Sequence, residues 1–361
     1  MQAQTSSGIN LRTVKQRLQE AGLPFVQLAL QDGLSIIVWQ RGGRIFGPFI
    51  DEDNPSIGWM SQAFNDAHQF QALIQSGEWN VGGTRAWISP ELQFHISDRY
   101  DFDGSYSLPA ALDPGNYTLE QISPAEFQLS QRIQMDTRIL ATGVKQLYLE
   151  QKIRAAADPL RKLPIYEELK PAYRFGGFEQ AFTLVDEDPN PIFSAVWTLM
   201  QLQPGGDLLI PTSIPEMVEF YRNPVAEPYL YNHPGYAQVK LTGNHQFKLA
   251  YYAAGLTGRL GYVIHTSPQS STLIVRNFFN NPSAEYAEEP PTRPGINGQS
   301  VYVYNDDGAL GGFGELECQG QSVGGSTGLQ RVSEQMQVWY YTGNRETISR
   351  LAQILLGVPL P

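Results

Sequence analysis

One short segment of the sequence, residues 77–95 (GEWNVGGTRAWISPELQFH), gathers the side-chain types that bind polar, ring-shaped ligands. A Gly-Gly pair is followed by Arg85 and Trp87, and Glu91 and His95 come after a proline. A sugar ring has apolar C–H faces and a rim of hydroxyl groups, so its recognition needs flat aromatic surface beside planar hydrogen-bonding groups. The segment therefore predicts carbohydrate binding. A purely structural role is the alternative, because Trp and Arg also anchor the cores of ordinary β-sandwiches.

Extended backbone would sort these side chains onto defined faces, because successive side chains of a strand point in opposite directions. After the two glycines, Arg85 and Trp87 would share one face. Beyond the proline, a second alternating stretch would place Glu91, Gln93 and His95 together, opposite two apolar residues. One face could then pack while the other carries out chemistry.

A second segment, residues 313–320 (FGELECQG), brings two carboxylates together. Alternation places Glu315, Glu317 and Gln319 on one face and Cys318 on the apolar face. The Cα atoms of the two glutamates would lie about 6.5 to 7 Å apart at the rise of a strand. One charge could then raise the pKa of the other where water is excluded, which would produce a general acid or base. The alternative is an exposed polar face of an edge strand.

Charge and composition limit the partners and cofactors. The 361 residues include 36 acidic and 25 basic residues, a net charge of −11, with no block of Lys or Arg. Binding to nucleic acid or to an anionic membrane is therefore not expected, and a neutral or cationic ligand fits better. The single Cys318 excludes an intrachain disulfide and a thiolate metal cluster. The five histidines show no metal-ligand spacing, so neither a metal nor another cofactor is predicted.

The chain also lacks the sequence features of export and membrane insertion. Its first ten residues are polar, without a basic or apolar signal region. No stretch approaches the roughly 20 apolar residues of a membrane span. We therefore expect a cytoplasmic protein, unless an export signal has been removed, and the sequence does not predict its oligomeric state.

The elements that must position these residues are mainly strands. With 34 glycines, 25 prolines and 42% hydrophobic residues, the chain can form many short strands around a large core. Strands are predicted over residues 25–30, 34–39, 44–50, 126–135, 146–154, 178–185, 192–203, 236–241, 246–252, 260–265, 272–279, 300–304, 313–319 and 336–341. Helices are predicted over residues 10–20, 60–75 and 346–356. We expect a helical appendage over residues 1–22 and a single β domain over residues 23–361. The Pro-rich stretch 281–298 is expected to be a surface loop.

Four segments occur in an order that resembles uncharacterised members of the galactose mutarotase-like superfamily. They are residues 42–49 (GGRIFGPF), 82–91 (GGTRAWISPE), 197–206 (WTLMQLQPGG) and 313–317 (FGELE). The resemblance spans most of the chain. It implies an antiparallel β-supersandwich, in which one broad curved sheet presents a sugar-binding concave face. The superfamily includes aldose 1-epimerases and other carbohydrate-active enzymes.

The resemblance also implies roles for individual residues. In aldose 1-epimerases a carboxylate removes the proton of the anomeric hydroxyl while a histidine protonates the ring oxygen, without a metal or organic cofactor. Glu317 is the best match for that carboxylate, and Arg85 could hold hydroxyl groups. The family's pair of histidines in the middle of the chain is missing. His95 is the preferred acid, with His233 and His245 as substitutes.

Three classes of function therefore stay open: a sugar epimerase, a noncatalytic carbohydrate-binding protein, and a glycoside hydrolase or lyase that uses the same face. The predicted ligand is a sugar or oligosaccharide. Its predicted binding residues are Arg85, Trp87, Glu91, Lys248 and Glu315. Pocket geometry around the proposed catalytic carboxylate would discriminate among the three classes.

Overall fold

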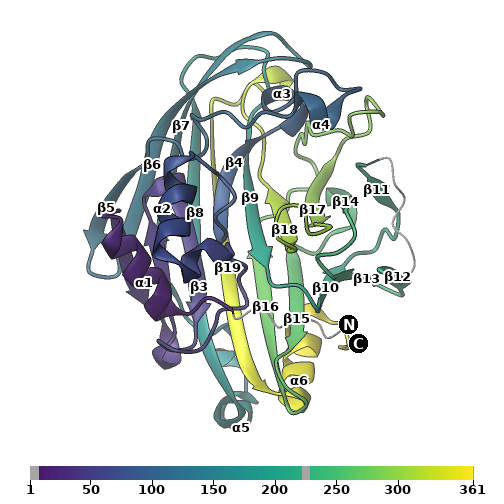
Figure 1. The fold of residues 1–361 in the computed structure, drawn as a ribbon. Coiled ribbons are helices and arrows are strands. Elements are labelled where there is room, and N and C mark those ends of the chain that lie inside the picture. The colour runs from purple at the N-terminus through teal and green to yellow at the C-terminus, as the bar shows by residue number, and fades with distance from the viewer. Residues whose placement is uncertain (1–7, 222–227, 361) are drawn as a thin grey trace.

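The computed structural model describes residues 8–221 and 228–360, and their strands form two antiparallel sheets (Figure 1). The nine-stranded sheet has the order β1 (Phe25–Ala29), β2 (Ser35–Trp39), β3 (Arg44–Phe49), β4 (Thr84–Ser89), β9 (Ala195–Leu202), β18 (Gly314–Gln319), β17 (Gln299–Asn305), β14 (Phe247–Tyr252) and β11 (Met217–Glu219). The ten-stranded sheet has the order β12 (Leu230–His233), β13 (Tyr236–Leu241), β10 (Gly206–Pro211), β15 (Arg259–His265), β16 (Ser270–Phe278), β19 (Arg331–Asn344), β8 (Tyr173–Asp186), β7 (Gly143–Ala156), β6 (Glu126–Thr137) and β5 (Thr118–Ser123). The predicted mainly β class and antiparallel sandwich are confirmed.

The main core lies between the two sheets. A single apolar cluster contains Leu249 and Leu316 of the nine-stranded sheet together with Ile274 and Val338 of the ten-stranded sheet. Because side chains alternate along a strand, the residues next to Leu249 and Leu316 project from the opposite face of their sheet. That outer face carries the functional pocket described below.

Two helices cover one end of the nine-stranded sheet. Helix α1 (Leu11–Glu20) begins at Asn10, whose side chain accepts a hydrogen bond from the backbone N–H of Thr13. It buries one apolar side in a cluster that includes Trp39 and Phe46 of the sheet. Helix α2 (Ala67–Gln75) lies beside it in Figure 1 and contacts it. The predicted helix over residues 60–75 is too long, because Asp66 caps α2 and only a short 3-10 turn precedes it.

Helix α6 (Arg345–Leu356) packs against β15, β16 and β19 at the end of the molecule opposite to helices α3 (Glu91–Phe94) and α4 (Phe102–Ser105) (Figure 1). Asn344 caps its first turn, and Gly357 ends it with φ of 74°. A short helix, α5 (Tyr166–Leu169), precedes β8. None of the helices in the described parts of the chain is long and apolar enough to cross a membrane.

The Pro-rich stretch 281–298 forms no strand, as predicted, but it is only partly a surface loop. Glu288, Glu289 and the two prolines that follow are buried. Glu289 pairs with Arg99, and Arg99 also donates to the backbone carbonyl of Pro291. The loop is therefore held against the segment between α3 and α4, close to the pocket.

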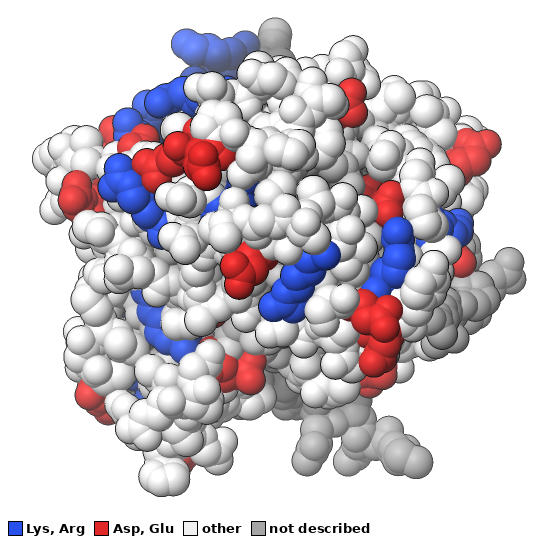
Figure 2. Space-filling view, turned by 90° about the horizontal axis from the view of Figure 1, so that it is seen from above, with Lys and Arg blue, Asp and Glu red and all other residues white. Residues whose placement is uncertain are grey.

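The net negative charge of the chain does not gather on the face above the pocket region. Figure 2 looks down on the end of the molecule where α3 and α4 lie in Figure 1, and it shows acidic and basic side chains in small groups separated by uncharged surface. This face therefore offers no large patch of a single charge sign.

Candidate functional site

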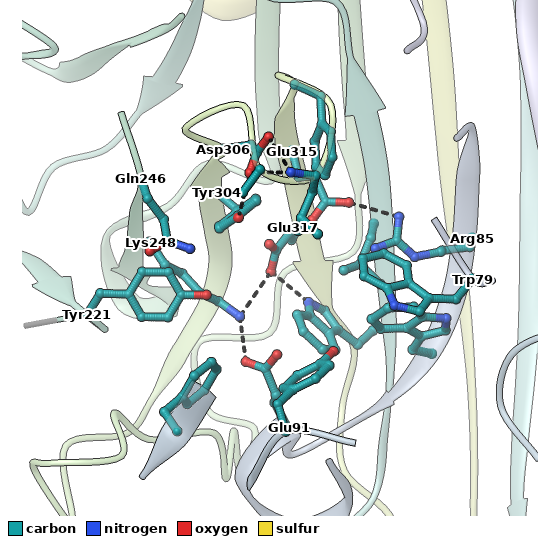
Figure 3. Close-up of a pocket in the computed structure, with 18 residues that line it drawn as sticks. Trp79, Arg85, Glu91, Tyr221, Gln246, Lys248, Tyr304, Asp306, Glu315 and Glu317 are labelled. Atoms are coloured by element: carbon teal, nitrogen blue, oxygen red, sulfur yellow. Dashed lines mark hydrogen bonds and ion pairs between the residues drawn. The ribbon is translucent and has the colours of Figure 1, made fainter. Parts of the chain in front are cut away.

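A pocket of about 350 Å³ opens on the outer face of the nine-stranded sheet (Figure 3). This volume is near the lower end of the range for small-molecule sites, about 300 to 1,000 Å³. Its aromatic lining consists of Trp79, Trp87, Phe102, Tyr106, Trp197, Tyr221, Tyr304 and Phe313. Its charged lining consists of Arg85, Glu91, Lys248, Asp306, Glu315 and Glu317. Leu199, Gln246, Ala309 and Leu310 complete it.

Strand register brings the floor of the pocket together from distant parts of the chain. Tyr304 of β17 is in register with Glu315 of β18 on one side and with Lys248 of β14 on the other. Leu199 of β9 is in register with both Arg85 of β4 and Glu317 of β18. Side chains of residues directly opposite each other in a sheet project from the same face. Five neighbouring strands thus present all of these groups to one cavity.

The rim is built from the connections around the sheet. Glu91 is the first residue of helix α3, where the backbone N–H of His95 donates to the Glu91 carbonyl at 2.8 Å. The predicted alternation of Glu91, Gln93 and His95 along a strand is therefore wrong. The proline before Glu91 starts a short helical turn, since it has no N–H to donate and its fixed φ suits such a turn. The turn places Glu91 over the sheet and into the pocket.

The loop after β17 forms another side of the rim. The Asp306 carboxylate accepts hydrogen bonds from the backbone N–H groups of Gly308, Leu310 and Gly312 at 2.8 to 3.1 Å. It also accepts from the hydroxyl of Tyr304 at 3.3 Å. These donors satisfy its charge, so Asp306 fixes the shape of the loop that carries Leu310 into the pocket wall.

Arg85 packs against the aromatic wall. Its guanidinium donates to Glu315 at 2.8 Å and lies over the rings of Trp87 and Trp79, 4.1 and 5.2 Å from their centroids. The indole N–H of Trp87 donates to the buried Asp113 at 3.1 Å. Trp87 is therefore fixed from behind and covered by Arg85, and it is only 2% exposed. The half-buried Trp79 is the indole that the wall leaves accessible.

Lys248 links the floor to the rim. Its ammonium lies 2.8 Å from Glu91 and 3.8 Å from Glu317, and 4.5 Å from the centroid of the Trp197 ring (Figure 3). Burial by itself lowers the pKa of Lys248, but Glu317, Glu91 and Glu288 outweigh that effect and raise its pKa above the usual value. Lys248 therefore keeps its positive charge throughout the neutral range.

Glu317 lines the pocket, and its protonation can change near neutral pH. Its Oε2 accepts the indole N–H of Trp197 at 3.0 Å. Burial, reinforced by the charges of Glu315 and Glu91 and opposed by Lys248, raises the pKa of Glu317 to about 8. Such a carboxyl can donate a proton at neutral pH and accept one when ionised.

A further carboxyl group lies behind the pocket. Glu288, in the Pro-rich loop, accepts a hydrogen bond from the backbone N–H of Glu91 at the start of helix α3. Burial and the charge of Glu91 raise the pKa of Glu288 to about 8. Glu288 thereby positions Glu91 and adds a third carboxyl group to the surroundings of Lys248.

Comparison with solved structures shows what this architecture is. A candidate aldose 1-epimerase from Escherichia coli K12 superposes with a TM-score of 0.51 over 88% of this chain and 99% of its own, at 10% sequence identity. A galactose mutarotase-like protein from Lactobacillus casei ATCC 334 gives a TM-score of 0.50 over 89% and 100%, at 11% identity. The chain has the galactose mutarotase-like fold. No protein-family profile matches the sequence, and no curated protein sequence matches it significantly.

Within this mutarotase-like fold, the sequence-predicted carboxylates and cations come together. Arg85, Glu91, Lys248, Glu315 and Glu317 all line the pocket. Neither glutamate of β18 lies on an exposed edge, because β18 is paired on both sides, with β9 and β17. Trp87 also lines the pocket, beneath Arg85.

The three histidines predicted as candidate acids, His95, His233 and His245, do not line the pocket. His95 is fully buried behind the aromatic wall, between the rings of Trp87 and Trp197, with Nδ1 3.5 Å from the hydroxyl of Tyr106. Burial, followed by the charge of Lys248, lowers the pKa of His95 to about 3. At neutral pH its imidazole is uncharged and therefore lacks the second ring proton that an imidazolium acid would donate.

His233 and His245 lie in other parts of the mutarotase-like fold. His233 is in β12, where its ring stacks on Tyr236 and bonds to Gln238 at 3.1 Å. His245 precedes β14 and stacks on Tyr229. Both imidazoles therefore have packing roles outside the described pocket lining.

Several lining residues were not predicted from the sequence. Trp197 belongs to a motif that carried the family resemblance, and the opposition of its strand to β4 could have identified it. Tyr106, Tyr221 and Asp306 lie in connections whose path depends on the whole fold, and no local pattern marks them. The same is true of Glu288, which acts through the backbone of a residue 197 positions away.

Proposed function

We propose that the protein binds a sugar in this pocket and that Glu317 is the acid–base group of an aldose 1-epimerase-like reaction. The observation that carries the proposal is the position of Glu317, a buried carboxyl group in the lining of a pocket of about 350 Å³ with aromatic walls. Its pKa of about 8 allows it to gain and lose a proton near neutral pH. The fold shared with a candidate aldose 1-epimerase and a galactose mutarotase-like protein supports the same assignment.

The proposed reaction interconverts the anomers of an aldose. Ionised Glu317 accepts the proton of the anomeric hydroxyl, the bond between C1 and the ring oxygen breaks with its electron pair on that oxygen, and protonated Glu317 then gives the proton to the ring oxygen. Rotation about the C1–C2 bond followed by the reverse steps closes the ring with the other configuration. Lys248, 3.8 Å from Glu317, would stabilise negative charge that develops on the ring oxygen. Arg85 and Glu315 would hold hydroxyl groups of the sugar.

The test is the rate of anomer interconversion. Freshly dissolved aldoses are followed by polarimetry or by proton NMR, with the native protein, with Glu317→Gln and without protein. General acid–base groups typically contribute factors of about 10² to 10⁴, so the variant should lose at least about 99% of the acceleration while it still binds sugar. Equal acceleration by both proteins would remove Glu317 from the mechanism.

A matched control distinguishes loss of chemistry from loss of a buried carboxyl group in general. Glu334 on β19 is also buried, and burial raises the pKa of Glu334 to about 7, but it does not line the pocket. Its side chain accepts the backbone N–H of Gln321 at 2.6 Å. Glu334→Gln should therefore leave the rate of anomer interconversion unchanged.

Noncatalytic sugar binding is the second candidate function. Two observations favour it. Among the described residues that line the pocket there is no histidine, and Glu317 shares its nearest cation with Glu91. A protein that binds aldoses in a calorimeter but accelerates no interconversion across a panel would have this function. Release of a chromophore from aryl glycosides would instead indicate a hydrolase.

A further inference from the structure

The charges on the wall of the pocket do not balance. Among the described lining residues there are two cations, Arg85 and Lys248, and four carboxyl groups. Arg85 is committed to Glu315 at 2.8 Å, and both side chains are buried. The Asp306 carboxylate is satisfied by backbone N–H groups of its own loop. The imbalance is therefore concentrated around Lys248.

Lys248 has more carboxyl groups around it than one positive charge can neutralise. Glu91 makes the shorter contact, 2.8 Å, whereas Glu317 lies 3.8 Å away. Glu288 lies close enough to raise the pKa of Lys248 as well. Of the two carboxyl groups that line the pocket beside Lys248, Glu317 therefore has the weaker ion pair.

The more weakly paired carboxyl group faces the cavity. Oε2 of Glu317 receives the Trp197 N–H and the contact with Lys248, but no donor of the described residues is hydrogen-bonded to Oε1. Figure 3 shows Oε1 directed away from Lys248 into the space lined by the sticks. Glu317 as a whole is only 1% exposed, so this oxygen is inside a built cavity and not on an open surface.

The aromatic rim suits the same kind of ligand. Phe102, Tyr106, Tyr221 and Trp79 are half-buried, which leaves part of each ring accessible at the pocket. Aromatic faces attract cations, and the attraction grows as water is excluded. A buried carboxyl oxygen below accessible aromatic rings is a favourable environment for a substituted ammonium group.

We propose that the sugar bound in this pocket carries a positively charged amino group. The inference depends on the proposed sugar-binding function and specifies its substrate class. The ammonium would donate to Oε1 of Glu317 and supply the missing counter-charge, while the hydroxyl groups of the ring bond to the other polar side chains. Sugar phosphates and sugar acids would be rejected, because both described cations of the wall are already paired with carboxylates.

Calorimetry on the native protein tests the inference directly. At pH 6.5 the amino sugars are cationic, and their ammonium group must displace the proton that Glu317 holds in the free protein. The ligands are glucosamine, glucose, N-acetylglucosamine and glucose 6-phosphate, and then the corresponding galactose series. The amino sugar of the better series should bind at least tenfold more tightly than both its parent sugar and its N-acetyl derivative, and the phosphate should bind least tightly. This comparison needs no variant, so it does not depend on whether a variant folds.

Two variants test whether Glu317 is the source of the preference for the amino sugar. In Glu317→Gln the affinity ratio between the amino sugar and its parent sugar should fall below about threefold, whereas Glu334→Gln should keep the native ratio. Equal affinity of the native protein for the amino sugar and its parent, or tighter binding of the phosphate, would overturn the inference and leave sugar binding standing. Failure of every sugar to bind would instead refute the proposed function itself.

Discussion

Glu317→Gln should make the protein more stable, although it should also remove the proposed activity. A carboxyl group whose pKa is raised by folding binds its proton more tightly in the folded state than in the unfolded chain. Between the two pKa values the folded state therefore holds more protons, and the free energy of unfolding falls as the pH rises. The amide of the substituted side chain has nearly the same shape, can still accept the Trp197 N–H, and never ionises.

The size of the effect follows from the pKa of Glu317, about 8 against 4.5 for an unperturbed glutamate. Each pKa unit corresponds to about 1.4 kcal/mol. The native carboxyl should thus cost nothing below about pH 4.5, about 3 kcal/mol at pH 7 and about 5 kcal/mol above pH 8, as an order of magnitude. Glu317 is 1% exposed, so solvent does not screen these interactions.

Urea unfolding of the native protein and the variant at pH 5, 7 and 8.5 measures this dependence. The stability gained by the substitution should grow across the series. Glu334→Gln provides a second curve, because the pKa of Glu334 is raised only to about 7. Its gain should reach about 3 kcal/mol and stop growing near pH 7. A loss of stability in Glu317→Gln at every pH, or a gain that does not change with pH, would refute the reasoning.

Three further predictions concern the site and its support. Trp79→Ala should weaken sugar binding about tenfold, measured by calorimetry, with little loss of stability. Trp87→Ala should lower the free energy of unfolding by about 3 to 5 kcal/mol, measured by urea unfolding. The rate of anomer interconversion, kcat/KM, should rise about tenfold per pH unit below pH 8 and level off above it, because ionised Glu317 is the base. Asn344→Ala should destabilise the protein by about 1 kcal/mol through loss of the α6 cap, with unchanged sugar affinity by calorimetry.

The strands that carry the site could be predicted because their pattern is local. In β18 each apolar residue is followed by a polar one, so the common face of Glu315 and Glu317 is visible in the sequence. The same alternation placed Cys318 on the core side, where the structure has it. Lys248 could be identified in the same way, since Phe247 and Leu249 beside it are core residues.

The rim could not be predicted, because short helices and loops depend on contacts that the sequence pattern does not contain. The four-residue helix α3 is too short for a helical period to appear, and its polar and apolar residues alternate as a strand would. Glu288, in a loop almost 200 residues later, accepts a hydrogen bond from the first backbone N–H of this helix. The family resemblance required a histidine acid, and the predicted polar face of a strand suggested His95. Burial behind Trp87 gives that imidazole a different environment from a pocket wall.

The same physical imbalance connects the stability and the ligand of this pocket. With no positively charged ligand, the carboxyl groups around Lys248 must either keep protons or repel one another, and both Glu317 and Glu288 have pKa values raised to about 8. A bound ammonium would remove part of that cost, so ligand binding and folding stability should increase together. An amino sugar should therefore raise the melting temperature of the native protein more than that of Glu317→Gln. A neutral sugar, which brings no charge, should raise both by similar amounts.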